Sequence, residues 1–277
     1  MRFPQPETDL RAFRLRKIKE PQYRHLWWLL FWPAYLMRYF LIENCNPAQS
    51  YHVMHCFLDD KIPFHEGFLI FYGCWYVFIV GIHLYTLLYD VDTFKRYSKF
   101  LCVSITMSTA IFLLYPSCQN LRPETFPRDN LLSRTVGLIY AVDTCTNVFP
   151  SEHVIGALAA LAAAAHTDRL RKPGRLLPLT VLTVLICVST LCLKQHSALD
   201  VLGALPICII SYLLCYEKRG YHEHLSCRYR YRLHNRKTGY SQGGRGNSLR
   251  RIPPPPCPYP ANPEIPADGG AEGAWPL

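Results

Sequence analysis

Hydrophobic residues gather in six stretches of the chain, each near the length of about 20 residues that an α-helix needs to cross a bilayer. These stretches are 26–42, 68–89, 100–115, 148–166, 176–193 and 197–216. The second and the fifth are the clearest, whereas the first contains Pro33 and Arg38 and the third is short, so these two also fit buried or interfacial helices. The pattern predicts an all-α fold, an integral membrane six-helix bundle.

Polar segments flank this bundle and divide the chain into a basic tail over 1–25, a membrane domain over 26–216 and a second tail over 217–277. Residues 217–277 are rich in Arg, Tyr, His and Gly and then in Pro, so they cannot bury enough apolar surface to offset their chain entropy. We therefore expect a disordered basic C-terminal tail. Between the third and fourth stretches, 130–142 mixes apolar and polar positions, which predicts a short helix lying on the membrane.

The net charge of +10 is distributed unevenly along the chain. Twenty-four of the 30 Lys and Arg residues fall in the two tails and in the loops 90–99 and 167–175, which six spans place on one side of the membrane. Cytoplasmic segments carry the excess of Lys and Arg, so both termini are expected in the cytoplasm. The basic tail would then lie beside anionic headgroups, and no motif indicates a nucleic-acid partner. We expect a multi-pass protein of the plasma membrane.

Two short polar clusters, 149–153 and 194–200, stand at the ends of apolar stretches. The chain crosses the bilayer and returns between them, so His153 and His196 are expected on the same, extracytoplasmic side. His196 and Asp200 are four residues apart at the start of an apolar helix and share one face of it. A carboxylate there can fix one imidazole nitrogen as a donor and leave the other as a nucleophile or base. Taken alone, the pair is more typical of a helix cap beside an interfacial histidine.

The first cluster has the pattern of a helix N-terminus, with Pro and Ser151 at its start. Backbone N–H groups at such an end attract phosphate, Ser151 adds a hydroxyl, and His153 can act as an acid. An ordinary N-cap, with Glu152 favourably placed against the helix dipole, explains the same residues. Arg122 adds a guanidinium suited to phosphate oxygens on the same side, although a solvated loop arginine is the simpler interpretation.

In this order, the residues resemble the type 2 phosphatidic acid phosphatase superfamily, which includes lipid phosphate phosphatases, undecaprenyl-diphosphate phosphatases and sphingolipid headgroup transferases. The family motifs are Lys-x6-Arg-Pro, Pro-Ser-Gly-His and Ser-Arg-x5-His-x3-Asp. They are matched by Arg122-Pro123, by Pro150-Ser151-Glu152-His153, and by Ser189-Thr190 followed by His196 and Asp200. The resemblance covers roughly 26–216 and neither tail.

The resemblance implies that His196 attacks phosphorus and forms a phosphohistidine, and that Asp200 orients His196. It implies that His153 protonates the leaving alcohol and then activates water or an acceptor alcohol. Arg122 and Ser151 would hold the phosphate oxygens. The implied partners are a membrane lipid phosphate and the bilayer, with no metal and no organic cofactor.

Three positions depart from the family pattern. Tyr115 and Thr190 stand where the family has a Lys and an Arg, so two phosphate cations are missing. Lys194, two residues before His196, is the nearest cation in sequence and the candidate replacement, although a straight helix would turn its side chain away. Glu152 stands where the family has Gly, and we expect it to point outward or to bind a cationic headgroup.

The sequence therefore predicts an enzyme that hydrolyses a lipid phosphate ester, such as phosphatidic acid or a polyprenyl diphosphate. One alternative is a headgroup phosphotransferase of the sphingolipid or inositol kind, using the same intermediate. Another is a non-catalytic membrane protein with a degraded site. The sequence makes no prediction about the oligomeric state.

Overall fold

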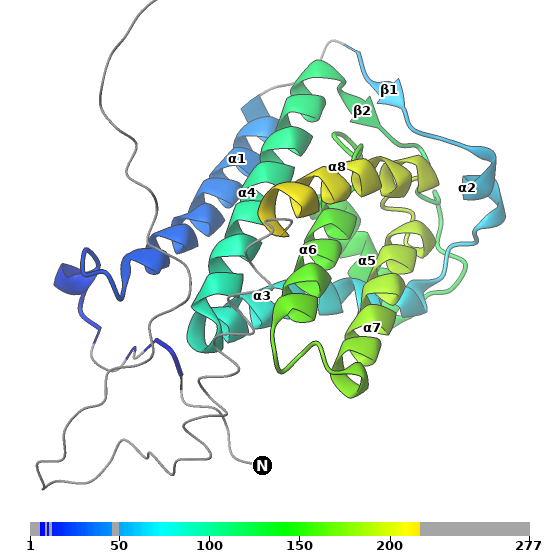
Figure 1. Ribbon diagram of the computed structural model, residues 1–277. Helices are drawn as coiled ribbons and strands as arrows, with labels where there is room; N and C mark the ends of the chain where they lie inside the picture. The colour runs from blue at the N-terminus through cyan, green and yellow to red at the C-terminus, as the bar shows by residue number, and fades with distance from the viewer. Residues whose placement is uncertain (1–5, 9, 11–12, 46–49, 217–277) are drawn as a thin grey trace, which may run out of the picture. The chain divides into compact units, whose positions relative to one another are not determined.

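The computed structural model describes residues 6–8, 10, 13–45 and 50–216 of the 277. The predicted disordered tail, 217–277, lies outside the described residues, as does part of the N-terminal tail. Helices make up most of the described part, and its only strands are two of two residues each (Figure 1), which confirms the all-α prediction.

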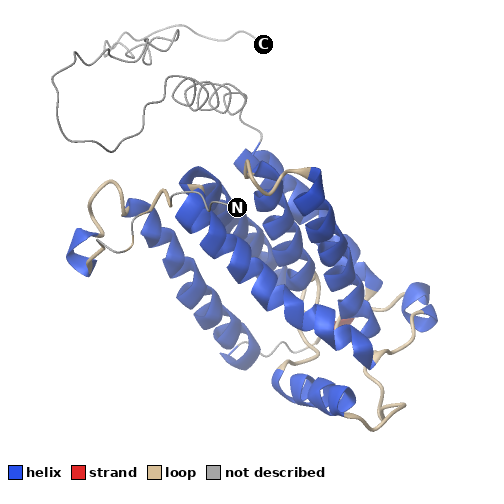
Figure 2. Ribbon diagram, turned by 90° about the horizontal axis from the view of Figure 1, so that it is seen from below, coloured by secondary structure: helices blue, strands red, loops and turns tan. Residues whose placement is uncertain are grey.

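The bundle is formed by α3 (Leu69–Tyr89), α4 (Val91–Leu114), α6 (Glu152–His166), α7 (Pro173–Cys192) and α8 (Ala198–Tyr216). Helix α6 is its centre and contacts each of the other four. Figure 2 shows the helices of the bundle packed side by side. Five alanines of α6 are fully buried: Ala157, Ala159, Ala160, Ala163 and Ala164. Small side chains let neighbouring helices approach closely, so the alanine-rich sequence explains the central position of α6.

Four helices of the described chain are long and apolar enough to cross a membrane: Glu66–Tyr89, Val91–Leu114, Pro173–Cys192 and Ala198–Tyr216. Their outer faces carry exposed aliphatic side chains, such as Val77 on α3, Val184 on α7 and Ile209 on α8. Contiguous apolar surface of this kind marks a membrane or a partner. The two remaining predicted spans correspond to shorter helices of 15 residues, α1 (Phe31–Cys45) and α6, so a six-span count stays a prediction.

Helix α4 begins earlier than the sequence predicted. The expected loop over 90–99 is helical from Val91, because the Asp90 carboxylate accepts the Thr93 N–H at 3.1 Å and caps the helix. Phe94 and Tyr97 in this segment are fully buried. The basic residues between them occupy the solvent side of a helix, and only a single residue separates α3 from α4.

The N-terminal segment packs against the bundle before residue 26. A 3-10 helix, Arg24–Leu30, precedes α1, and Tyr23 and Leu26 form a buried cluster with Leu87 and Phe94. The segment predicted as a tail over 1–25 therefore includes residues of the folded core.

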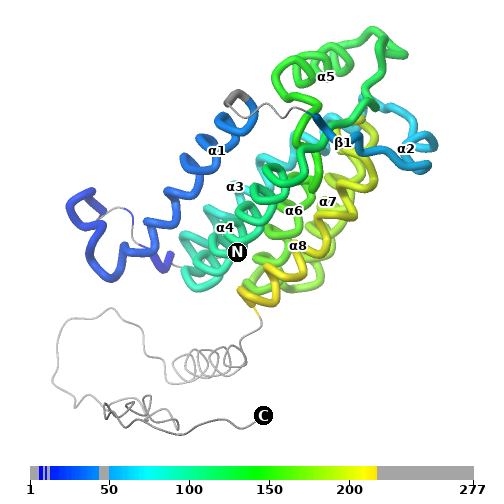
Figure 3. The backbone as a smooth tube through the Cα atoms, turned by 90° about the horizontal axis from the view of Figure 1, so that it is seen from above, coloured from blue at the N-terminus to red at the C-terminus, as the bar shows by residue number. Residues whose placement is uncertain are grey.

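The chain between α1 and α3 and between α4 and α6 covers the opposite end of the bundle from the α3–α4 turn (Figure 3). It contains β1 (His52–Val53), α2 (Phe57–Lys61), the 3-10 helix Glu66–Phe68, β2 (Ser117–Cys118) and α5 (Leu131–Val142). Strands β1 and β2 pair in parallel. Helix α5 confirms the short helix predicted over 130–142, and the Asn130 side chain caps it by accepting the Ser133 N–H at 2.9 Å.

Candidate active site

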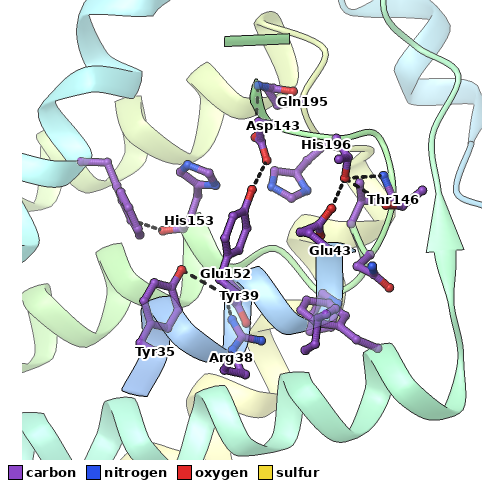
Figure 4. Close-up of a pocket in the computed structure, with 17 residues that line it drawn as sticks. Tyr35, Arg38, Tyr39, Glu43, Asp143, Thr146, Glu152, His153, Gln195 and His196 are labelled. Atoms are coloured by element: carbon purple, nitrogen blue, oxygen red, sulfur yellow. Dashed lines mark hydrogen bonds and ion pairs between the residues drawn. The ribbon is translucent and has the colours of Figure 1, made fainter. Parts of the chain in front are cut away.

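A pocket lies where α1, the start of α6 and the α7–α8 connection meet (Figure 4). His153 and His196 both line it, although they are 43 positions apart in the sequence. The predicted return of the chain therefore brings the two polar clusters together. The other polar side chains of the lining are Tyr35, Arg38, Tyr39, Glu43, Asp143, Thr144, Thr146, Asn147, Glu152 and Gln195.

His196 and Asp200 form the pair that their spacing predicted. His196 Nδ1 lies 3.3 Å from Asp200 Oδ2, and the Asp200 side chain is fully buried. The same oxygen accepts the Ser197 N–H at 2.8 Å. An ionised Asp200 can only accept hydrogen bonds, so this contact favours the tautomer of His196 that carries its proton on Nδ1 and keeps a lone pair on Nε2. This nitrogen is the candidate nucleophile.

The position of His196 depends on how α7 ends. Lys194 adopts a left-handed conformation with φ of 52°, which closes the helix. The carbonyl of Thr190 then accepts the N–H groups of Gln195, at 3.0 Å, and of His196, at 3.2 Å. Satisfying a late helix carbonyl through a left-handed residue is a common helix ending, and here it directs His196 toward the pocket.

His153 stands in the first turn of α6 and faces His196, with 5.6 Å between the ring centroids. Its ring packs between Tyr72 and Trp75, each at 4.6 Å, and the Trp75 indole donates to the His153 carbonyl at 2.8 Å. These contacts fix the orientation of the ring. The buried Nε2 of His153 has no hydrogen-bond partner within the described chain, so it is available to a bound group.

A backbone hydrogen bond and a close packing contact hold the start of α6 against α8 beside the two histidines. The N–H of Ser151 donates to the Asp200 carbonyl at 3.1 Å, and Ser151 is fully buried as the N-cap of α6. A Cβ atom built at Gly203 would lie 2.2 Å from the Phe149 ring, so only glycine lets α8 approach this closely. The peptide bond between Phe149 and Pro150 is cis.

Glu152 does not point outward. Its carboxylate accepts from Arg38 Nη2 at 2.7 Å and from the Tyr35 hydroxyl at 3.1 Å, and only 13% of its side chain is exposed. Arg38 belongs to α1 and also donates to Thr109 of α4 at 3.2 Å. The sequence identified Arg38 as a charge inside an apolar stretch, but it gave no sign of the partner 114 positions away.

Arg122 lies behind the pocket. Its Nη atoms donate to the carbonyls of Tyr140, Asp143 and Thr144 and to Gln195 Oε1, at 2.7–3.1 Å. The guanidinium thus ties the end of α5 to the residue that precedes His196. Arg122 does not line the pocket, so contact with a phosphate bound there would require its side chain to move.

Lys194 is held at the end of α2. Its ammonium donates to the carbonyls of Asp59 at 2.7 Å and Ile62 at 2.5 Å, and the residue does not line the pocket. The chain does leave helical geometry here, but the side chain turns toward α2. A role in binding substrate would require the ammonium to leave both carbonyls.

Asp59 is the supporting residue that the sequence did not indicate. Its carboxylate accepts from Ser197 Oγ at 2.6 Å, from the Ala198 N–H at 2.8 Å and from the Cys56 N–H at 2.8 Å. Burial alone would raise the pKa of Asp59, but the hydrogen bonds, led by that from Ser197, outweigh it and hold the pKa below 3.8. The three-residue spacing of Cys56 and Asp59 suggests a capping box, which marks the start of α2 but not the contact with α8.

The pocket thus holds a histidine paired with a buried carboxylate and a second histidine, in a bundle with four helices long and apolar enough to cross a membrane. The described residues contain no group of three His, Cys, Asp or Glu side chains placed to hold a metal ion. The family model for the PAP2 superfamily matches residues 97–223. This match over residues 97–223 supports membership of the type 2 phosphatidic acid phosphatase superfamily, whose members are phosphatases or related phosphotransferases.

The match contains His153, His196 and Asp200 but leaves out α1, α2 and α3. Searches of curated proteins and of solved structures find no match to the chain. The comparisons therefore do not specify the branch of the superfamily, and the function proposed below rests on the residues of the site.

Proposed function

We propose that this protein hydrolyses a lipid phosphate ester through a phosphohistidine intermediate. The observation that carries the proposal is the pair of imidazole rings in one pocket, 5.6 Å apart, with only His196 bonded to a buried carboxylate. This contact gives the two histidines different roles, because the carboxylate favours a nucleophilic Nε2 on His196 and leaves His153 as the acid.

In the first step, Nε2 of His196 forms a bond to phosphorus while the bond from phosphorus to the lipid oxygen breaks. Protonated His153 gives its proton to that oxygen, and the lipid alcohol leaves. In the second step, His153 takes a proton from water, the water oxygen bonds to phosphorus, and the bond to His196 breaks. Phosphate is released, and both histidines return to their starting protonation states.

Backbone N–H groups in the first turn of α6 face the region where phosphate oxygens would sit, and they favour negative charge. Ser151 starts this helix, Glu152 neutralises the cation beside it, and Arg122 holds Gln195 at the pocket wall. These contacts support a positioning role for each residue in substrate binding.

We place the site on the extracytoplasmic side, with both chain ends in the cytoplasm. Support comes from the loop between α6 and α7. This loop joins the end of α6 to the start of α7, whereas His153 lies at the start of α6 and His196 follows the end of α7. That loop carries Arg169, Arg171 and Lys172. The site end of the same helices carries fewer basic residues, as the positive-inside rule requires.

The test is a phosphate-release screen in detergent over phosphatidic acid and polyprenyl diphosphates, with His196→Ala as the inactive variant. His55→Ala is the matched control, because His55 is an exposed histidine in the loop between β1 and α2. We expect release by the wild type and by His55→Ala only, and an acid-labile phosphoprotein that His196→Ala lacks. Equal release by His196→Ala would contradict the proposal.

A parallel assay with a ceramide-like alcohol distinguishes hydrolysis from transfer. A phosphotransferase forms a new phospholipid from the same intermediate, whereas a hydrolase releases phosphate regardless of the acceptor. A chain that neither releases nor transfers phosphate and forms no phosphoprotein would be a non-catalytic membrane protein.

A further inference from the structure

Arg38 is the single Lys or Arg side chain among the described residues that line the pocket. The same lining contains the carboxylates of Glu43, Asp143 and Glu152. A phosphate entering beside the histidines therefore meets three acidic groups and one guanidinium. Anions in partly buried sites need a cationic or N–H partner, so the position of this guanidinium matters.

We propose that Arg38 is the phosphate-binding cation of this pocket and that Glu152 holds it in place. The proposal rests on the function given above, in that it names a binding residue for the same site. It differs from the roles drawn from the sequence motifs, because Arg38 comes from α1, outside the segment 97–223 that the family model matches.

The first argument concerns the donors that Arg38 has left. A guanidinium carries five N–H donors in one plane, and the structure occupies one on Nη2 with Glu152 and one on Nη1 with Thr109. The buried Nε has no partner within the described chain. Such a group keeps enough donors to bind two phosphate oxygens without releasing its carboxylate.

The second argument concerns how the side chain is kept in the pocket. An arginine near a membrane interface extends its flexible chain toward water. Here Glu152 holds Nη2 at 2.7 Å, and the guanidinium stacks on Tyr35 at 5.1 Å and lies 5.8 Å from the centre of the Phe112 ring. These contacts hold it beside the first turn of α6, and only 16% of its side chain is exposed.

The third argument concerns Glu152. A carboxylate next to a phosphate site repels the substrate unless it is neutralised, and its Oε1 is buried without a partner in the described part of the protein. Pairing with Arg38 removes this repulsion. Glu152 alone would oppose phosphate binding, but through this contact it holds Arg38, the residue that favours phosphate binding, in position.

The experiment measures binding of inorganic phosphate to the full chain in detergent by equilibrium dialysis, together with lipid turnover. The main variant is the neutral pair Arg38→Gln with Glu152→Gln, which removes both charges and so leaves neither one buried alone. We expect its phosphate dissociation constant to rise about 10- to 100-fold, the loss typical of one charged hydrogen-bonded contact. Arg134→Gln is the matched control, because Arg134 is an exposed arginine paired with Asp129, and it should bind as the wild type does.

If Arg38 only neutralised Glu152, the neutral pair would bind phosphate as the wild type does, and that result would overturn the proposal. Undetectable phosphate binding by the wild type would overturn it as well. Glu152→Gln alone provides a second measurement should the neutral pair fail to fold. It removes the charged anchor that holds the guanidinium in place, so we expect weaker phosphate binding, and binding as tight as that of the wild type by a folded Glu152→Gln protein would count against the assignment.

Turnover separates this proposal from the proposed function. If the wild type binds phosphate through Arg38 but releases none from any lipid, the hydrolase function fails and the binding assignment stands. If lipid turnover depends on His196 but not on Arg38, the assignment fails and the function stands.

Discussion

Replacing Asp59 should reveal how much the active site depends on α2. The structure gives its carboxylate three hydrogen bonds: Oδ1 accepts from Ala198, and Oδ2 accepts from Ser197 and Cys56. Asp59→Asn keeps an oxygen that accepts from the Ala198 N–H, but it places an NH2 group opposite the Ser197 hydroxyl and the Cys56 N–H. The Ser197 hydroxyl can rotate and accept, whereas the Cys56 N–H cannot.

One hydrogen bond is thus lost and the others lose their charge. Hydrogen bonds to charged groups contribute about 1.5–3 kcal/mol each and an unsatisfied buried donor costs about 1–3 kcal/mol, so Asp59→Asn should lower the free energy of unfolding by about 2–3 kcal/mol. Asp59→Ala removes every acceptor and should cost about 3–5 kcal/mol, allowing for non-additivity. Because Ser197 follows His196 directly, kcat/KM should fall together with stability.

Reversible unfolding in mixed SDS micelles measures these changes, with Asp60→Asn as the matched control. The Asp60 side chain is 64% exposed and bonds only to His55 at the surface, so its replacement should stay within about 0.5 kcal/mol of the wild type. Equal losses for Asp59→Asn and Asp60→Asn would refute the reasoning.

Comparison of the wild type with Asp59→Asn also gives a pH test. The pKa of folded Asp59 lies below its usual 3.8, so the ionised carboxylate stabilises the protein above that pH. This contribution is lost as pH falls through the lowered pKa. The stability difference between the wild type and Asp59→Asn should therefore be constant near neutral pH and shrink in acid below about pH 4.

Three further predictions follow from the site and the bundle. Asp200→Asn should lower kcat by roughly 10²- to 10⁴-fold without unfolding the protein, because an amide no longer fixes the tautomer of His196; steady-state kinetics and the melting temperature check this. Cysteine labelling in intact membranes should place Lys172 in the cytoplasm and Glu152 outside, and labelling of both from one side would contradict the topology. Lys194→Gln should lower the melting temperature and leave KM unchanged if its ammonium only caps α2, whereas a role in binding phosphate would appear as a raised KM.

The sequence predicted the parts of the structure that depend on short-range pattern. Hydropathy located the ends of α3 and α8 to within one residue and those of α7 to within three, and the four-residue spacing of His196 and Asp200 predicted their contact. The start of α4 was predicted about nine residues late. The first turns of α4 contain charged residues as well as buried aromatic residues such as Tyr97. The charges lower the average hydropathy of this segment, so a search for apolar stretches places the start of the helix too late.

The supporting contacts could not be predicted in the same way. Arg38 meets Glu152 across 114 positions, and Asp59 meets Ser197 across 138. Each partner alone has an ordinary explanation, a charge near a helix end or an acid in a loop, and nothing in either local pattern indicates the other. Lys194 shows the same limit, because the direction of its side chain depends on a left-handed backbone at one residue and on carbonyls supplied by α2.

The contact between Phe149 and Gly203 has a consequence for how this protein tolerates change. Helices α6 and α8 each bring part of the chemistry, and their separation is limited there by a ring pressed against a bare backbone. Any side chain at position 203 would collide with the Phe149 ring and push apart the helices that carry His153 and Asp200. A saturation library should therefore find position 203 nearly immutable, while Leu202 beside it, exposed on the outer face, accepts most apolar replacements.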